Sequence, residues 1–248
     1  MRLSIRAISK NYGGIAALSG AGFDIDGPGI YGLIGPNGAG KTTLFDIVAG
    51  NVAPDRGEVR LEGRDVTGFP AHRMARLGVA RTFQECRVLP EETCLENILF
   101  AAQPKRLSSA LAQAFSRSKR HRHAVREEAL RLLALVRLED YVDVPASRLS
   151  FGQRRLLEIV STFVASPDVL LLDEPGSGVN PTLLETLAQF IRAMYAERPR
   201  VFLLVEHNME FVMSLASDII VMHQGAVLER GSPEAVQSSA RVIEAYLG

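Results

Sequence analysis

Residues 35–42 read Gly-Pro-Asn-Gly-Ala-Gly-Lys-Thr and follow directly on the apolar stretch Ile30–Ile34. Glycines at these spacings let a backbone wrap around a phosphate group, and a helix beginning near Lys41 directs its amide groups toward that anion. The Lys41 ammonium can reach β- and γ-phosphates, and the Thr42 hydroxyl can ligate Mg²⁺. A strand, a glycine-rich loop and a helix in this order predict a site for a nucleoside triphosphate.

The composition is that of an ordinary folded chain. It has 248 residues, of which 47% are hydrophobic and 23% charged, and its formal net charge is zero. Balanced charge gives no support for a nucleic-acid or anionic-membrane surface. No apolar run approaches the roughly 18 residues of a membrane-spanning helix, and no signal-peptide core follows the start. Cys86 and Cys94 lack metal-type spacing, and we expect reduced thiols in a cytoplasmic protein.

Hydrophobic patterning predicts an α/β fold. The first thirty residues alternate weakly, which favours antiparallel strands at a sheet edge, and residues 57–66 alternate like a hairpin. Compact apolar runs at Val169–Leu172, Val201–Val205 and Ile219–Met222 are typical of parallel strands buried on both faces. Residues 93–165 carry apolar side chains at helical spacing, which indicates a helical subdomain inserted into the core.

The expected organisation is a single domain spanning residues 1–248. The expected segments are an antiparallel and phosphate-loop part (1–92), a helical subdomain (93–165), the rest of the α/β core (166–231) and a helical tail (232–248). Further expected elements are helices at Lys41–Val48 and 71–76 and a short strand at Val79–Phe83.

Two carboxylates end the apolar strand Val169–Leu172, in the order Asp173-Glu174. The carboxyl end of a strand in an open α/β sheet lies beside the phosphate site, so these acids are placed for chemistry. We expect Asp173 to hold Mg²⁺, directly or through water, and Glu174 to polarise a water for attack on the γ-phosphate.

Three further features resemble the ATP-binding cassette (ABC) ATPases. Leu149-Ser150-Phe151-Gly152-Gln153 resembles their signature loop, usually L-S-G-G-Q. Gln84, after the strand at 79–83, resembles their Q-loop glutamine, and His207, after the strand Val201–Val205, resembles their switch histidine. The order of loop, glutamine, signature, acidic strand and histidine also agrees with that family. The fold expected is therefore a P-loop NTPase (RecA-like) core with a parallel sheet, an N-terminal antiparallel β subdomain and an inserted helical subdomain.

The resemblance implies an ATPase whose active site is completed by a second cassette. In such proteins the signature loop, here Ser150, Gly152 and Gln153, closes on the ATP of a partner. Asn180 stands at the D-loop position, where most cassettes have aspartate, and Phe151 replaces the second signature glycine. Tyr12 resembles the aromatic residue that stacks on adenine, with a structural tyrosine as the alternative.

The implied site residues fall into three groups. The catalytic group is Glu174, His207 and Gln84, and the metal group is Thr42, Gln84 and Asp173. The ATP-binding group is Tyr12, Gly35, Pro36, Asn37, Gly38, Ala39, Gly40, Lys41, Thr42, Thr43, Ser150, Gly152, Gln153 and Asn180.

Several motifs resemble the larger ATPase subunit of bacterial branched-chain (hydrophobic) amino acid importers. Among them are Val79-Ala-Arg-Thr-Phe-Gln84, Val205-Glu-His-Asn-Met209 and the ending Ala245-Tyr-Leu-Gly248. The implied partners are a second, identical or homologous, ATPase subunit, two membrane permease subunits and, indirectly, a solute-binding protein. The implied location is the cytoplasmic face of the inner (plasma) membrane. Apolar residues after Gln84, such as Leu89 and Leu95, either line a groove for a permease helix or belong to the core.

Other functions remain open at this stage. The solute could be urea, an amide or an aromatic acid, because the cassette does not touch it, and an exporter cassette is the nearer rival. A soluble ABC ATPase acting on nucleic acid or ribosomes is less consistent with one cassette, no heptad arm and no net positive charge. A P-loop small-molecule kinase would not explain residues 149–153.

Overall fold

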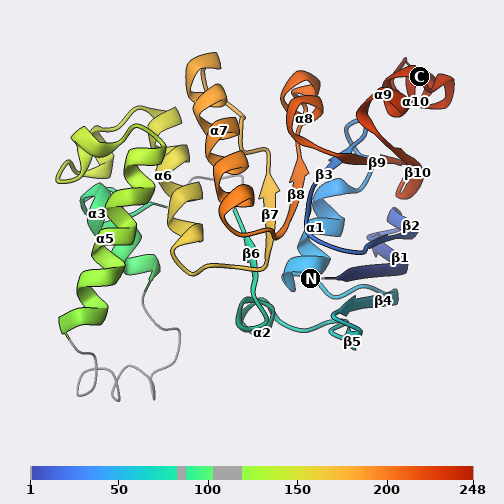
Figure 1. Cartoon of the computed structure of the whole chain (residues 1–248). Helices are drawn as coiled ribbons and strands as arrows, with labels where there is room; N and C mark the ends of the chain where they lie inside the picture. Colours follow the sequence, from blue (N-terminus) through green and yellow to red (C-terminus); the bar gives the residue numbers. More distant parts are fainter. Residues whose placement is uncertain (1, 83–87, 103–118, 248) are drawn as a thin grey trace. The chain divides into compact units, whose positions relative to one another are not determined.

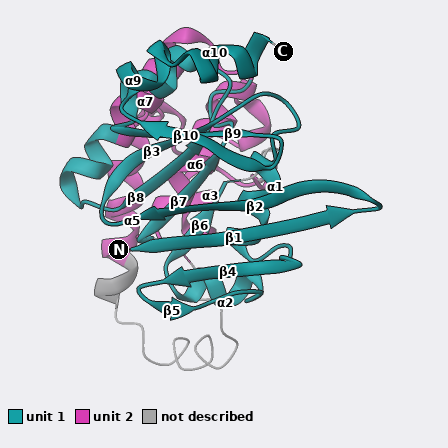
Figure 2. Ribbon diagram, turned by 90° about the vertical axis from the view of Figure 1, so that its right-hand side faces the viewer, with its two compact units in different colours: residues 1–84, 167–177, 192–248 teal, residues 85–166, 178–191 magenta. Residues whose placement is uncertain are grey.

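The computed structural model describes residues 2–82, 88–102 and 119–247. The chain divides into two compact units, coloured separately in Figure 2. The first unit comprises residues 1–84, 167–177 and 192–248, and the second comprises 85–166 and 178–191.

The first unit holds two sheets, and one of them is antiparallel (Figure 1). Its order is β2-β1-β4-β5, with every neighbouring pair antiparallel. The strands are β1 (Leu3–Tyr12), β2 (Ile15–Ile25), β4 (Arg56–Leu61) and β5 (Arg64–Asp65). The antiparallel strands expected in the first thirty residues and the hairpin expected over 57–66 are confirmed.

The other sheet has six strands in the order β10-β9-β3-β8-β7-β6. Its strands are β3 (Gly29–Ile34), β6 (Val79–Arg81), β7 (Val169–Asp173), β8 (Val201–Val205), β9 (Asp218–His223) and β10 (Ala226–Gly231). The strands from β9 to β6 run parallel, and every residue of β3, β7 and β8 is buried, which confirms the parallel core. The apolar runs do not indicate β10, which pairs antiparallel with β9 at the sheet edge.

The β6 strand is shorter than the sequence predicts. It ends at Arg81 rather than Phe83, although the Thr82 N–H still donates to the Leu171 carbonyl at 3.0 Å. Phe83 lies outside the described residues.

Helix α1 (Lys41–Ala49) packs between the two sheets of the first unit (Figure 1). It contacts β2 of the antiparallel sheet and both β6 and β7 of the parallel one, so one apolar core joins all three layers. Gly50 ends the helix with a left-handed φ of 78°, a conformation that glycine adopts without steric cost.

The remaining helices of the first unit are short. They are α2 (Ala71–Arg76), α8 (Met209–Leu215), α9 (Pro233–Ser238) and α10 (Ala240–Leu247), and the last two lie in the segment expected to be a helical tail. Helices α8, α9 and α10 share a second apolar cluster with Ile34, Ile219 and Val221 of the parallel sheet. Within the described ranges, no helix has the length and apolarity needed to cross a lipid bilayer.

The second unit is helical in its described part. It contains α3 (Cys94–Ala101), α5 (Lys119–Leu135), α6 (Phe151–Phe163), two short 3₁₀ turns (Glu139–Tyr141 and Ala146–Arg148) and the first part of α7 (Pro181–Glu197). Helix α3 contacts both α5 and α6. Ala129, Leu132, Leu133 and Val136 are fully buried, as their helical spacing predicts.

Candidate nucleotide site

The phosphate loop connects β3 to α1 through residues 35–40. A side chain would not fit at two of its glycines. A Cβ added at Gly35 would lie 2.1 Å from the Met222 carbonyl oxygen, and one at Gly40 would lie 2.5 Å from the Ala17 oxygen. Gly40 is also the N-cap of α1 and provides no side-chain cap, so the first amides of the helix remain available to an anion. This cradle fits the phosphate chain that the sequence predicts.

Lys41 is buried at the start of α1 and turns back over the loop. Its ammonium donates to the carbonyls of Gly35 at 2.6 Å and Pro36 at 3.0 Å. Burial lowers the pKa of Lys41, and the nearby carboxylates Glu174 and Asp173 act in the opposite direction. The charge of the lysine therefore interacts with those of both acids.

The register of the parallel strands explains why these groups meet. Val205 on β8 pairs with Leu33 on β3 and with Asp173 on β7. The carboxyl ends of three strands therefore reach the same edge of the sheet, where the phosphate loop begins.

Asp173 is fully buried at the end of β7 and pairs with an arginine. Its Oδ2 lies 2.7 Å from Arg81 Nη2, and Arg81 Nη1 lies 2.5 Å from Oδ1 of Asp46 on α1. Burial raises the pKa of Asp173, and the hydrogen bond and positive charge of Arg81 oppose that rise. The arginine thus connects the carboxylate at the strand end to the helix that carries the phosphate loop.

Glu174 and His207 are joined across the ends of β7 and β8. The distance from Glu174 Oε1 to His207 Nε2 is 2.9 Å. The Glu174 N–H donates to the Val205 carbonyl at 2.8 Å, and its backbone has a left-handed φ of 44°. A non-glycine residue held in this region is strained, and such strain is concentrated at functional sites.

The oxygen ligands expected for Mg²⁺ fit that cation, which prefers carboxylate, hydroxyl, water and phosphate oxygens. Thr42 and Thr43 lie half-buried in the first turn of α1, and the Asp173 carboxylate belongs to the same unit. Gln84, expected to be both a ligand and a catalytic residue, lies outside the described residues.

The signature residues begin helix α6 in the second unit. Ser150 is the N-cap and forms a reciprocal capping box with Gln153: the Gln153 N–H donates to Ser150 Oγ at 3.3 Å, and the Ser150 N–H donates to Gln153 Oε1 at 2.9 Å. Gly152 is buried, and a Cβ there would lie 2.7 Å from Leu183 Cδ1. Ser150 is exposed and Gln153 is half-buried at a helix N-terminus, the arrangement expected of an anion-binding loop.

Asn180 caps a helix, and the Tyr12 ring is exposed. The Leu183 N–H donates to Asn180 Oδ1 at 2.9 Å, so Asn180 caps the start of α7. Tyr12 ends β1 with 46% of its surface exposed, and Lys10 Nζ lies 5.6 Å from the ring centroid. An exposed ring is available for stacking on a planar group.

From the sequence, the apolar residues after Gln84 are expected either to line a groove for a permease helix or to belong to the core, and the structure separates them. Leu95 is buried on α3, which places it in the core of the second unit, whereas Leu89 is 40% exposed. Leu89 therefore remains a candidate for a permease contact, and so does the half-buried Val88.

The motifs do not point to two charged residues that lie next to the candidate site residues. Arg81 resembles an ordinary strand residue in the sequence, yet its side chain is only 8% exposed and pairs with Asp173. Glu206 precedes His207 and is also buried. A charged residue beside a strand end was the available signal for both.

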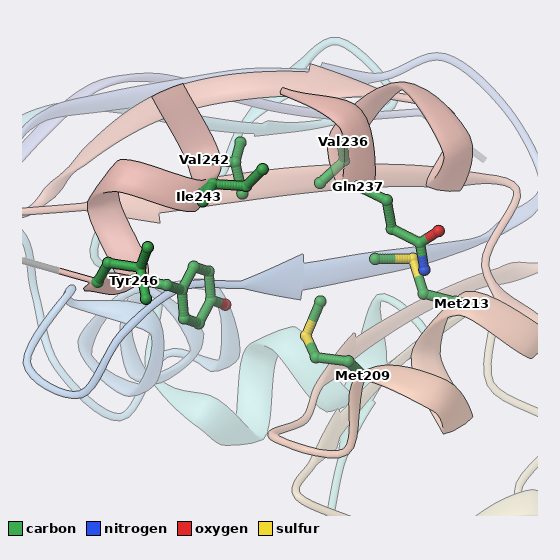
Figure 3. A pocket seen from close by; sticks show the side chains of 8 residues that line it. Met209, Met213, Val236, Gln237, Val242, Ile243 and Tyr246 are labelled. Carbon is green, nitrogen blue, oxygen red and sulfur yellow. The ribbon is translucent and has the colours of Figure 1, made fainter. Parts of the chain in front are cut away.

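A separate pocket of about 250 Å³ lies between α8 and the C-terminal helices (Figure 3). Methionines from α8 face valine, isoleucine and tyrosine side chains from α9 and α10. The lining residues are Met209, Met213, Val236, Gln237, Val242, Ile243, Tyr246 and Leu247. No lining side chain carries a charge, so this pocket is chemically unlike the phosphate loop.

Comparison with known proteins identifies the family. The family model described as ABC transporter matches residues 18–177. The branched-chain amino acid transport ATP-binding protein BraF of Pseudomonas aeruginosa is 38% identical over 99% of this chain and 97% of its own length. LivG of Escherichia coli, with the corresponding description, is 36% identical over 99% and 97%. The lipopolysaccharide export system ATP-binding protein LptB of Acidithiobacillus ferridurans is 34% identical over 88% of this chain and 85% of that protein.

Solved structures agree with this assignment. A nucleotide-free ATP-binding cassette from an ABC transporter superposes with a TM-score of 0.85 at 29% identity, covering all of both chains. The ADP conformation of another ATP-binding cassette gives 0.84 at 29% identity, covering 100% of this chain and 99% of that one. The expected α/β cassette fold is confirmed, and the chain belongs to the ABC transporter family.

Proposed function

We propose that this chain is the ATP-hydrolysing subunit of an ABC importer for branched-chain or related hydrophobic amino acids. The observation that carries this proposal is the Glu174–His207 pair beside the phosphate loop, in a chain similar over nearly its full length to BraF and LivG.

Within that function each group of the site has a separate task. The α1 amides and Lys41 bind the phosphates, and Tyr12 offers a ring for the adenine. Glu174 takes the proton of the attacking water, and His207 orients the Glu174 carboxylate. Mg²⁺, held by Thr42, Asp173 and Gln84, would neutralise charge on the phosphates.

The proposed working form contains two cassettes. Ser150, Gly152, Gln153 and Asn180 would complete the nucleotide site of an identical or homologous partner subunit. Closure and opening of the two cassettes would drive two permease subunits from the cytoplasmic face of the membrane. A solute-binding protein would deliver the solute to those permease subunits. Replacing Ser150 with arginine in this subunit should therefore impair hydrolysis at the partner's nucleotide, because a bulky cation blocks the shared site.

A nucleotide-binding measurement tests the first part of the proposal. Lys41→Ala should lose most affinity for a fluorescent ATP analogue, whereas Arg198→Ala, a surface change outside the site, should keep it. Unchanged affinity in Lys41→Ala would place the phosphates elsewhere.

An uptake measurement in the native host tests the solute. Deletion of the gene should abolish high-affinity uptake of labelled leucine, and the wild-type gene but not the Lys41→Ala form should restore it. Loss of urea, amide or aromatic-acid uptake with normal leucine uptake would assign a different solute. The similarity to LptB makes an exporter the second candidate, and defective export with unchanged uptake of all these solutes would favour it.

A further inference from the structure

Glu206 is a buried carboxylate that none of the motifs assigns to a task. It stands between the end of β8 and His207, and only 5% of its surface is exposed. A carboxylate is seldom buried to this extent unless its oxygens accept hydrogen bonds or it pairs with a cation.

The two oxygens of Glu206 accept from two different loops. Oε1 accepts a short hydrogen bond from the Gly176 N–H, two residues beyond Glu174. Oε2 accepts from the His207 N–H at 3.1 Å and lies 3.5 Å from the Asn208 nitrogen. One side chain therefore ties the segment after Glu174 to the segment that begins with His207.

Three other hydrogen bonds at these segments make different connections. The Ser177 N–H donates to the Glu174 carbonyl at 3.1 Å, which closes a turn within the first segment. The Phe211 N–H donates to Asn208 Oδ1 at 3.0 Å, which caps α8 within the second. The Glu174 N–H bond to the Val205 carbonyl joins the ends of β7 and β8, and His207 takes no part in it.

We propose that Glu206 is a positioning residue that sets the separation between Glu174 Oε1 and His207 Nε2. This inference rests on the proposed ATPase function and adds a residue that acts through the catalytic pair. Because both segments are anchored to one rigid carboxylate, a shift of either one changes the 2.9 Å contact.

A carboxylate suits this task better than its amide. All groups bound to Glu206 are N–H donors, and an ionised carboxylate presents two acceptor oxygens. Glutamine has one acceptor oxygen and one NH₂ donor, so one of the two loops would face a donor instead of an acceptor. Burial raises the pKa of Glu206, and the amide hydrogen bonds from Gly176, Asn208 and His207 oppose that rise.

The decisive variant is Glu206→Gln in the full chain. We expect kcat for ATP hydrolysis to fall about ten- to a hundredfold, because the catalytic pair is misplaced. Affinity for a fluorescent ATP analogue should stay within about twofold, since the hydrogen bonds of the Glu206 side chain within the described residues go to Gly176, His207 and Asn208. The matched control is Asp168→Asn, an acid-to-amide change at the partly exposed residue just before β7, which should leave kcat unchanged.

A spectroscopic measurement tests the geometry without turnover. The sequence holds five histidines, so the His207 imidazole can be assigned in a ¹⁵N-histidine spectrum by comparison with His207→Ala. In Glu206→Gln the Nε2 signal should move toward the position it takes in Glu174→Gln, because both changes disrupt the same contact. Asp168→Asn should leave that signal unmoved.

The outcomes separate this inference from the proposed function. An unchanged kcat and an unmoved His207 signal in Glu206→Gln, with a wild type that hydrolyses ATP, would overturn the positioning role alone. Parallel losses of kcat, nucleotide affinity and melting temperature would also overturn it, since they would show general support of the fold. A wild type without ATPase activity would refute the proposed function, while the His207 signal would still report on the contact.

Discussion

Glu174 Oε1 lies 2.9 Å from His207 Nε2 although the backbone of Glu174 is held at a left-handed φ of 44°. The left-handed conformation turns the chain sharply after the buried strand β7, which directs the side chain toward the end of β8. An extended residue here would continue the strand and carry the carboxylate away from the histidine. The left-handed turn at Glu174 and its contact with His207 therefore belong together in the geometry of this strand end.

Replacing the carboxylate at Glu174 should separate binding from hydrolysis. In Glu174→Gln the side chain keeps its size but cannot accept a proton from water, so we expect kcat to fall by roughly 10²- to 10⁴-fold. Nucleotide affinity should persist because Lys41 and the loop amides are intact. The variant should also accumulate as an ATP-bridged dimer, visible by size-exclusion chromatography with ATP.

The matched comparison is Glu210→Gln, an exposed acid in the first turn of α8. Its turnover should equal that of the wild type. Normal hydrolysis by Glu174→Gln would assign the general base to another group.

The sequence predicts the phosphate loop and the buried strands because short stretches of neighbouring residues define them. Glycine spacing determines the loop before Lys41, and continuous apolar runs determine buried parallel strands such as Val201–Val205. Each of these depends on neighbours within a few residues, so a single sequence carries the information.

The site residues that the sequence does not reveal are those defined by contacts between residues far apart in the chain. Arg81 meets Asp173 across 92 positions, and Glu206 meets Gly176 across 30. The local signal of each residue is weak, because a charged residue at a strand end usually faces solvent. The edge strand Ala226–Gly231 is only partly buried, so its pattern is weak as well.

Removing the arginine beside Asp173 should destabilise the fold. In Arg81→Gln the buried Asp173 carboxylate loses the cation that offsets its burial, and Asp46 loses its link to β6. We expect the free energy of unfolding, measured by urea titration, to fall by about 3 kcal/mol. Arg198→Gln breaks a surface pair with Asp168 and should cost about 1 kcal/mol or less. Equal losses in the two variants would contradict a special role for the buried pair.

The end of α5 offers a stabilising change. Arg137 is exposed with a φ of 59°, and the Leu138 N–H donates to the Leu133 carbonyl at 2.9 Å, as in a Schellman C-cap. Glycine adopts this left-handed conformation without a Cβ clash, so Arg137→Gly should raise the melting temperature by a few degrees, corresponding to about 1 kcal/mol. Arg137→Ala keeps the clash and loses the charge, and it should not stabilise. A higher melting temperature in both variants would attribute the effect to charge instead.

The thiol of Cys94 should make stability fall at alkaline pH. It is fully buried at the start of α3, and burial raises its pKa from 9.0 to about 11. Above pH 9 the unfolded thiol ionises while the folded thiol stays protonated, so the folded state binds more protons and stability declines as pH rises toward 11. Between about pH 8.5 and 10.5 this single group should remove on the order of 1–2 kcal/mol of unfolding free energy.

Lysines and tyrosines also titrate in this range, so the Cys94 contribution is the difference between the wild type and Cys94→Ala. Urea titrations at several pH values should show the wild type losing stability faster than the variant as pH rises. Iodoacetamide gives an independent reading in a Cys86→Ser background, where native Cys94 should react far more slowly than the same thiol in guanidinium. Parallel pH profiles for the two proteins, together with rapid native labelling, would mean that the thiol ionises as it does in water.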